Sequence, residues 1–234
     1  MSAAGIEERV KPYYIAEGIQ IFNGDCREIL PSLGAVDSVI TDPVWPNSSK
    51  ELIGSDRPGP LMAEMCEVLP KSERLIVHLG CDSDPRFLCS IPHSFPFLKI
   101  CWLRYACPTR KGRNLYGADV AYVFGKYPQS RPGRRVISGE YCSTKPNVRR
   151  MIVTKHKEWG KPVPGEHPTP RRLQHLRWLV SKWAEGMILD PFCGSGTTLL
   201  AAKLNGLPAI GIEMDERWCE ISANRLAQKV LEFE

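Results

Sequence analysis

The sequence feature that most constrains the fold is a glycine turn between an apolar run and a helix-like segment. The apolar residues 186–192 lead into Gly194 and Gly196, and a helix is expected to begin at Thr197. Glycine lets the backbone approach a ligand closely, and the free N–H groups at a helix start favour an anionic or carboxylate-bearing ligand. Glu213, at the end of the next apolar run, is placed to accept hydrogen bonds from ribose hydroxyl groups. The pattern predicts a ligand that contains a nucleoside.

Two well-known ligand loops do not fit this turn. A phosphate-binding P-loop places a lysine before its Ser or Thr, whereas Thr197 and Thr198 follow Gly196 directly. A NAD-binding turn requires a third glycine at position 199, which is Leu199 in this chain. The nucleoside is therefore expected to belong to a different cofactor.

Alternation of strand-like and helix-like segments predicts an α/β fold. The 234 residues are enough for one such domain with a full core. Alternating segments of this kind form a mostly parallel sheet with helices on both faces. Strands are expected at residues 19–24, 36–41, 74–80, 98–103, 118–125, 186–192 and 207–213, and helices at 26–33, 61–70, 170–184, from 197, and from about 215 to 231.

Positive charge is concentrated in one part of the chain. Residues 126–172 contain twelve Lys and Arg residues and three acidic residues, although the net charge of the whole chain is only +5. Pro, Gly, Arg and Lys dominate residues 128–168, which we interpret as an insertion with little core of its own. A local excess of this size predicts contact with a polyanion, and a solvated charged surface is the alternative.

Cysteine spacing and hydropathy indicate the compartment. The nine cysteines include no C-x-x-C pair and no histidine partners at zinc-site spacing, so buried reduced thiols are expected rather than metal sites or disulfides. No apolar run reaches the roughly 18 residues of a membrane span, and the first residues lack the apolar core of a signal peptide. These features predict a reducing cytoplasmic setting.

The glycine turn also carries a family resemblance. The run DPFCGSGTT at residues 190–198 resembles the cofactor loop of S-adenosylmethionine-dependent DNA amino-methyltransferases, the N6-adenine and N4-cytosine DNA methylases. The resemblance extends over residues 11–227. It includes the GDC turn at residues 24–26 and the HPTPRR segment at residues 167–172, which is similar to the family's H-P-T-x-K-P motif. In this chain Arg171 and Arg172 replace the Lys and Pro of that motif.

The order of the motifs resembles the permuted arrangement called class β. The segment DPVW at residues 42–45 occupies the place of the catalytic [DNS]-P-P-[YFW] motif, ahead of the glycine loop. The resemblance implies a doubly wound, mostly parallel, seven-stranded Rossmann-like sheet. It implies a single methyltransferase domain over residues 1–234, with residues 126–166 as a basic target-recognition insertion within it.

The resemblance implies S-adenosylmethionine as the cofactor. Asp25 would bind the amino group of the cofactor's adenine, and Thr169 with the following helix start would hold its methionine part. Glu213 and Met214 resemble the acidic ribose-binding turn. The cofactor-binding residues carried over are Asp25, Cys26, Asp42, His167, Thr169, Asp190, Phe192, Gly194, Ser195, Gly196, Thr197, Thr198, Glu213 and Met214.

The chemistry explains why an acid and a tryptophan stand at the end of the strand at residues 36–41. The Asp42 carboxylate and the Pro43 carbonyl would accept hydrogen bonds from the exocyclic amino group of the target base, which aims the lone pair of the nitrogen at the methyl group. Trp45 would stack on a base flipped out of the duplex. Val44 stands where the family has a second proline, which leaves the Pro43 carbonyl less rigidly aimed.

The resemblance implies double-stranded DNA as the substrate. Asp42 at the first motif position favours N6 of adenine over N4 of cytosine, because cytosine-N4 members more often carry Ser there. Residues 105–117 form either a second DNA-facing surface or an ordinary connection. The residues expected to contact DNA are Arg134, Arg135, Arg149, Arg150, Lys155 and Lys157.

Several alternatives stay open at this level. Methylation of RNA or of a protein amide needs similar geometry, and the variation at Val44 permits a catalytically silent DNA-binding module that still binds S-adenosylmethionine. The resemblance implies that the cytoplasm is that of a bacterial cell or a phage-infected host. The sequence does not distinguish a separate restriction endonuclease partner from a solitary or phage-encoded role, or a monomer from a homodimer.

Overall fold

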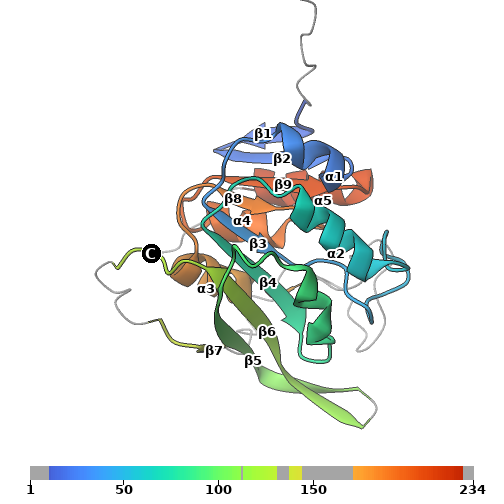
Figure 1. The fold of residues 1–234 in the computed structure, drawn as a ribbon, viewed down its shortest axis with the longest axis vertical. Helices are drawn as coiled ribbons and strands as arrows, with labels where there is room; N and C mark the ends of the chain where they lie inside the picture. The colour runs from blue at the N-terminus through green and yellow to red at the C-terminus, as the bar shows by residue number, and fades with distance from the viewer. Residues whose placement is uncertain (1–10, 112, 131–136, 144–170, 229–234) are drawn as a thin grey trace, which may run out of the picture.

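The computed structural model describes residues 11–111, 113–130, 137–143 and 171–228. These residues form one nine-stranded sheet with helices on both faces, and the strand order is β1-β2-β9-β8-β3-β4-β6-β5-β7 (Figure 1). The strands are β1 (Tyr14–Ala16), β2 (Ile19–Asn23), β3 (Ser38–Thr41), β4 (Arg74–Gly80), β5 (Phe97–Lys111), β6 (Asn114–Gly125), β7 (Glu140–Cys142), β8 (Ile188–Asp190) and β9 (Ala209–Glu213). The helices are α1 (Cys26–Ile29), α2 (Pro58–Glu67), α3 (Leu173–Trp183), α4 (Thr197–Lys203) and α5 (Glu216–Ala227), with short 3₁₀ helices η1 (Leu30–Ser32) and η2 (Pro85–Ser90).

The middle of the sheet is parallel and buried on both faces. Strands β2, β9, β8, β3 and β4 pair in parallel with one another, in that order. Every residue of β3 and β4 is buried. Strands buried on both faces are near-continuous apolar runs, which is why the sequence shows them so clearly. The α/β class and the doubly wound, mostly parallel arrangement are confirmed.

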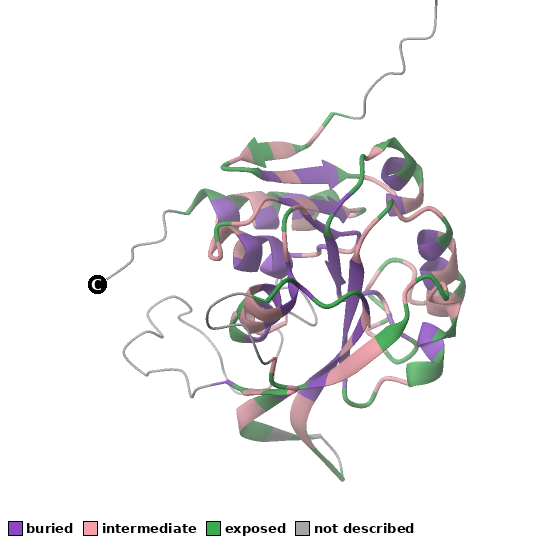
Figure 2. Cartoon of the chain, turned by 60° about the vertical axis from the view of Figure 1, so that its left-hand side comes forward, coloured by how far each residue is buried: buried purple, intermediate pink, exposed green. Residues whose placement is uncertain are grey.

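Two apolar cores lie on opposite faces of this sheet. One contains residues of α3, α4 and α5, and the other contains residues of α1, α2 and η2. Neighbouring strand residues alternate between them, so that Ile40 belongs to the first core and Val39 to the second. Figure 2 shows the buried residues concentrated in the central strands and on the inner sides of the helices. Among the described residues, no helix has the length and apolar character that a membrane crossing demands.

The strand count differs from the expected seven because two short edge strands join the sheet. Strand β1 pairs antiparallel with β2, and β7 pairs in parallel with β5. Each has three residues, which is too short for an alternating pattern to be visible in the sequence. Strand β7 lies within the basic insertion, and Ile137 and Tyr141 pack against the core. The described part of this segment therefore packs on the core of the main sheet.

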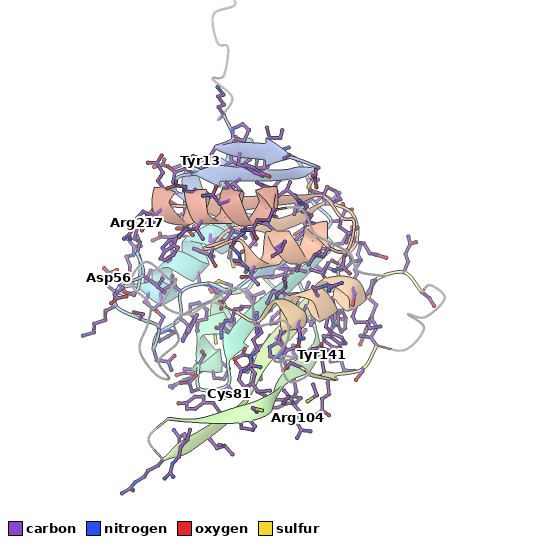
Figure 3. The ribbon with its side chains drawn as sticks, turned by 180° about the vertical axis from the view of Figure 1, so that it is seen from behind. Tyr13, Asp56, Cys81, Arg104, Tyr141 and Arg217 are labelled. Carbon is purple, nitrogen blue, oxygen red and sulfur yellow. The ribbon has the colours of Figure 1, made fainter. Side chains whose placement is uncertain are left out.

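Residues 105–117, for which a connecting loop was one expectation, form most of the outer half of a β-hairpin. Strands β5 and β6 are antiparallel, with an irregularity in the pairing between Arg104 and Thr109, and the hairpin extends away from the body of the protein (Figure 1). Leu115 near its end is 69% exposed. Cys81 and Arg104 lie near the base of the hairpin (Figure 3). The connecting-loop interpretation is therefore wrong, and a projecting two-stranded arm takes its place.

Candidate active site

The candidate site lies where the chain reverses the direction in which it builds the sheet. From β3 the chain continues outward to β4, whereas from the adjacent β8 it continues in the opposite direction to β9. Open α/β sheets bind ligands in the crevice at such a switch point, outside the carboxyl ends of the strands. Asp42 follows β3 directly and Asp190 ends β8. The Thr41 hydroxyl donates a 2.9 Å hydrogen bond to the Asp190 carboxylate, which joins the two strand ends.

A cavity of about 380 Å³ occupies this crevice. Its walls include every predicted site residue that the structure describes except Gly196, whose missing side chain would point toward Ser222 of α5. The predicted residues that line it are Asp25, Cys26, Asp42, Pro43, Trp45, Asp190, Phe192, Gly194, Ser195, Thr197, Thr198, Glu213 and Met214. The lining residues that the sequence patterns did not predict include Arg27, Leu52, Arg57, Arg171 and Trp218. Their positions depend on contacts between distant segments, so no local pattern identifies them.

The glycine loop has the backbone conformation that the sequence predicts. Gly194 and Gly196 have φ angles of 48° and 76°, in the left-handed region that favours glycine. The helix α4 begins immediately afterwards. The loop is held from behind by Arg225 of α5, whose guanidinium donates to the Ser195 carbonyl and, at 3.3 Å, to the Thr197 hydroxyl. Burial lowers the pKa of Arg225.

Glu213 joins two segments of the cavity wall. Its carboxylate oxygens accept hydrogen bonds of 2.9 Å each from the backbone N–H groups of Gly194 and Asp215. Burial raises the pKa of Glu213, and these hydrogen bonds oppose that shift. Each oxygen keeps a lone pair for a ligand hydroxyl group. Met214 beside it is 39% exposed.

Asp25 is partly committed to local structure. Its carboxylate caps α1 by accepting from the Arg27 N–H at 2.9 Å, and it also binds the Arg27 guanidinium. These hydrogen bonds lower the pKa of Asp25. Arg27 in turn contacts Glu64 of α2. Burial raises the pKa of the adjacent Cys26 thiol to about 12, so this residue is an apolar wall rather than a nucleophile.

The carboxylate of Asp42 is bound by Arg171, which the structure places just before α3. The Arg171 Nε atom lies 2.6 Å from Oδ2 of Asp42, and Nη2 lies 2.8 Å from Oδ1. The same guanidinium lies 4.6 Å from the centre of the Trp45 ring. Arg171 therefore covers one face of the ring that was expected to receive a base. The Trp45 residue as a whole is only 7% exposed.

Behind Arg171 lies a buried cluster of three ionisable side chains. Oδ2 of Asp119 on β6 lies 3.4 Å from Nε2 of His78 on β4 and 3.6 Å from Nδ1 of His175 on α3. Oδ1 of Asp119 lies 3.3 Å from Nη1 of Arg171. The histidine separations exceed a good hydrogen bond, so we treat them as electrostatic contacts.

These contacts determine the ionisation of the cluster. Burial acts to raise the pKa of Asp119, but His175, His78 and Arg171 together hold it far below its usual range. Burial lowers the pKa of His78, so this ring is neutral at physiological pH. For Arg171 the two carboxylates outweigh burial and raise its pKa. The ligand atoms of the three cluster residues lie within 4.8 Å of one another, which is the spacing of a candidate metal site.

Several predicted site residues lie outside the described part of the chain. These are His167 and Thr169 of the cofactor set and Arg134, Arg135, Arg149, Arg150, Lys155 and Lys157 of the DNA-binding set.

The sheet, the switch-point cavity and the glycine loop form an arrangement in which open α/β folds bind nucleoside-containing ligands. A family model described as DNA methylase matches residues 112–224. The putative methylase YubD of Escherichia coli (strain K12) is 24% identical over 89% of this chain and 90% of its own length. The type II methyltransferase M2.DpnII of Streptococcus pneumoniae is 38% identical over 32% of this chain and 27% of its own length.

Solved structures show the same fold. The M1.HpyAVI–SAM complex matches with a TM-score of 0.65 and 20% identity, over 90% of this chain and all of that one. The PvuII DNA methyltransferase (cytosine-N4-specific) matches with a TM-score of 0.67 and 15% identity, over 95% of this chain and 91% of that one. The chain thus matches a DNA methylase family model over residues 112–224 and has the fold of solved DNA methyltransferase structures.

Proposed function

We propose that the protein transfers a methyl group from S-adenosylmethionine to the exocyclic amino group of a base flipped out of double-stranded DNA, with N6 of adenine favoured over N4 of cytosine. The observation that carries this proposal is that Asp42 and the glycine loop line one cavity. An acceptor for an amino group and a loop for a nucleoside thus face the same space.

The residues of the cavity fit the cofactor. Gly194 lines the cavity with no side chain, so the backbone of the loop can approach a ligand there. Glu213 offers acceptor atoms for ribose hydroxyl groups, and Phe192 and Trp218 offer apolar surface for an adenine ring. When bound, S-adenosylmethionine supplies a methyl group on a positively charged sulfur.

Asp42 and Pro43 would orient the target nitrogen. The lone pair of an exocyclic amino group is delocalised into the ring, so the group is a poor nucleophile. Two fixed acceptors, the Asp42 carboxylate and the Pro43 carbonyl, would bind its two N–H groups and favour the tetrahedral geometry in which the lone pair points toward the methyl group. Positive charge develops on the nitrogen during transfer, so these acceptors stabilise the transition state more than the ground state.

Trp45 would support the flipped base. Because Arg171 covers one face of the ring, the base would stack on the opposite face. Stacking of a base on an aromatic side chain contributes about 1–3 kcal/mol. The amino group is paired inside a duplex, so the base must leave the helix to reach Asp42.

We propose that residues 126–166 form the target-recognition insertion of a single domain. Arg134, Arg135, Arg149, Arg150, Lys155 and Lys157 would contact phosphates or base edges. The hairpin of β5 and β6 is a second candidate DNA surface, since Arg110 and Arg113 near its end are exposed.

The test is a nucleoside digest. Purified protein is incubated with mixed-sequence duplex DNA and S-adenosylmethionine carrying a labelled methyl group, and the DNA is digested for mass spectrometry. Labelled N6-methyladenine is the expected product. Labelled N4-methylcytosine would reverse the proposed base preference. Absence of label in DNA, with cofactor binding retained, would overturn the proposed activity and favour a silent DNA-binding module.

A further inference from the structure

Arg171 contacts both residues that the proposed function places around the target base. It binds the carboxylate of Asp42 through two nitrogen atoms and lies over the ring of Trp45. We propose that Arg171 is a positioning residue for methyl transfer, which fixes Asp42 and Trp45 in the geometry that receives the base. This inference rests on the proposed function of those two residues.

The contact with Asp42 restricts the carboxylate without saturating it. Two parallel N–H···O bonds set the plane and the rotation of a carboxylate, which a single contact does not. A carboxylate has about four lone-pair positions, and Arg171 uses two of them. The remaining positions accept the N–H group of a target base.

The contact with Trp45 fixes the second wall. A guanidinium 4.6 Å from the ring centre is at the distance of a cation–π interaction. It occupies one face of the indole, so the ring cannot turn toward that side. A base would then stack on the opposite face of the ring. Arg171 thus sets the position of both Trp45 and the Asp42 carboxylate.

Arg171 is itself held from behind by the buried cluster. Nη1 of Arg171 lies 3.3 Å from Oδ1 of Asp119, while Oδ2 of Asp119 faces His78 and His175. Asp119 and both histidines are almost completely buried. The cluster joins β4, β6 and α3, so the anchor of Arg171 is part of the rigid framework of the sheet.

Charge explains why this anchor is present. The Arg171 side chain is only 12% exposed, and a buried guanidinium requires compensation by carboxylates. The Asp42 carboxylate alone would neutralise the charge of the Arg171 guanidinium. Without a second contact, however, the Arg171 side chain could move, and Asp42 would move with it. Asp119 supplies a second, immobile carboxylate, and this fixes the guanidinium in relation to the sheet.

A metal ion bound by His78, Asp119 and His175 is the competing interpretation of the cluster. The structure favours the interpretation that the cluster anchors Arg171, because the Asp119 carboxylate already contacts the Arg171 guanidinium. A divalent cation at the same carboxylate would be repelled by the positive charge of Arg171. Elemental analysis of the purified protein separates the two: less than stoichiometric metal supports the anchor, and one equivalent of tightly bound metal would overturn it.

The main experiment compares Arg171→Lys with the wild-type protein. Lysine keeps the charge but loses the two parallel bonds and the planar contact with Trp45. We expect kcat to fall about 100-fold, because a small misplacement of reacting groups has an effect of this size, while the dissociation constant for S-adenosylmethionine stays within about threefold. Arg177→Ala, at an exposed position on α3, is the matched control and should keep wild-type kcat.

Chemical rescue separates positioning from general structural damage. In Arg171→Ala, added guanidinium or methylguanidinium at millimolar concentration should raise kcat about tenfold, because the small cation can occupy the space between Asp42 and Asp119. Added methylammonium should have a much smaller effect. Rescue that is equal for both cations, or wild-type kcat in Arg171→Lys, would overturn the inference.

The result also separates this inference from the proposed function. A wild-type protein that transfers no methyl group to DNA contradicts the function itself. A wild-type protein that is active, together with fully active Arg171 variants, contradicts only the role of Arg171.

Discussion

A Cβ atom on residue 196 would overlap the hydroxyl group of Ser222, so Gly196 and Ser222 are in direct contact between the cofactor loop and α5. Ser222 is completely buried. The loop therefore has no room to move back from the cavity, and its shape depends on a helix that follows it in the chain.

This contact predicts that Gly196→Ala greatly weakens binding of S-adenosylmethionine. The new methyl group would displace Ser222, and the left-handed backbone adds a cost of about 1 kcal/mol. We expect the dissociation constant, measured by calorimetry, to rise at least about tenfold. Gly206→Ala is the control, because Gly206 has φ of 67° but no neighbouring atoms within 4 Å of the point that a Cβ atom would occupy. Equal affinity in the two variants would contradict this role for the loop.

Asp42→Ala is expected to abolish methyl transfer and to spare most cofactor binding. Loss of a fixed transition-state acceptor typically reduces kcat by about 10²–10³. The variant also leaves Arg171 without its nearest carboxylate, so Asp42→Asn is a second variant that keeps the shape of the side chain. Single-turnover assays with labelled cofactor measure the rate, and near wild-type turnover in Asp42→Ala would show that this carboxylate has no role in transfer.

Arg225→Ala is expected to weaken cofactor binding, although the Arg225 side chain does not line the cavity. Removal of its guanidinium leaves the Ser195 carbonyl and the Thr197 hydroxyl without their partner. A buried unsatisfied polar group costs about 1–3 kcal/mol, which corresponds to a loss of about tenfold in affinity if the bound state depends on the loop. Arg86→Ala, at a highly exposed side chain on η2, should bind the cofactor as the wild-type protein does. Unchanged affinity in Arg225→Ala would mean that the loop keeps its shape alone.

The raised pKa of the buried Asp190 carboxyl group predicts that the stability of the protein depends on pH. Burial raises the pKa of its carboxyl from 3.8 to about 7, despite hydrogen bonds from Thr198, Thr41 and Phe192. A raised pKa means that the folded protein prefers the protonated acid. The associated stability is fully present below about pH 4 and is lost as the pH rises through about 7.

Asp190→Asn removes this dependence. Between pH 4 and pH 8 the free energy of unfolding of the wild-type protein should fall relative to that of the variant, by at most about 4 kcal/mol. Urea unfolding of both proteins at several pH values measures the difference. Parallel curves over this range would show that Asp190 has an ordinary pKa.

Much of the framework is readable from local sequence patterns. The runs at residues 36–41, 74–80 and 207–213 correspond to β3, β4 and β9 within a few residues, because strands buried on both faces need continuous apolar residues. The glycine loop is equally visible, since left-handed backbone at Gly194 and Gly196 requires that residue type.

Other features depend on contacts that no local pattern records. The outer part of the β5–β6 hairpin is polar and exposed, so it resembles a loop in sequence. Arg171 stands out in the sequence only as a departure from a family motif, and its partner Asp42 lies far away along the chain. The capping role of Asp25 depends on Arg27, whose side chain conformation the sequence does not determine.

The central position of β8 has a consequence for synthesis of the protein on the ribosome. The β4 partner of β3 is translated long before β8, so the other edge of β3 has no partner until Ile188 and Leu189 emerge. Until then the chain exposes an unpaired apolar strand edge, which favours association with chaperones. The acid at residue 42 and the glycine loop therefore become a single site only late in translation, so a prematurely terminated chain has no place to bring a cofactor and a base together.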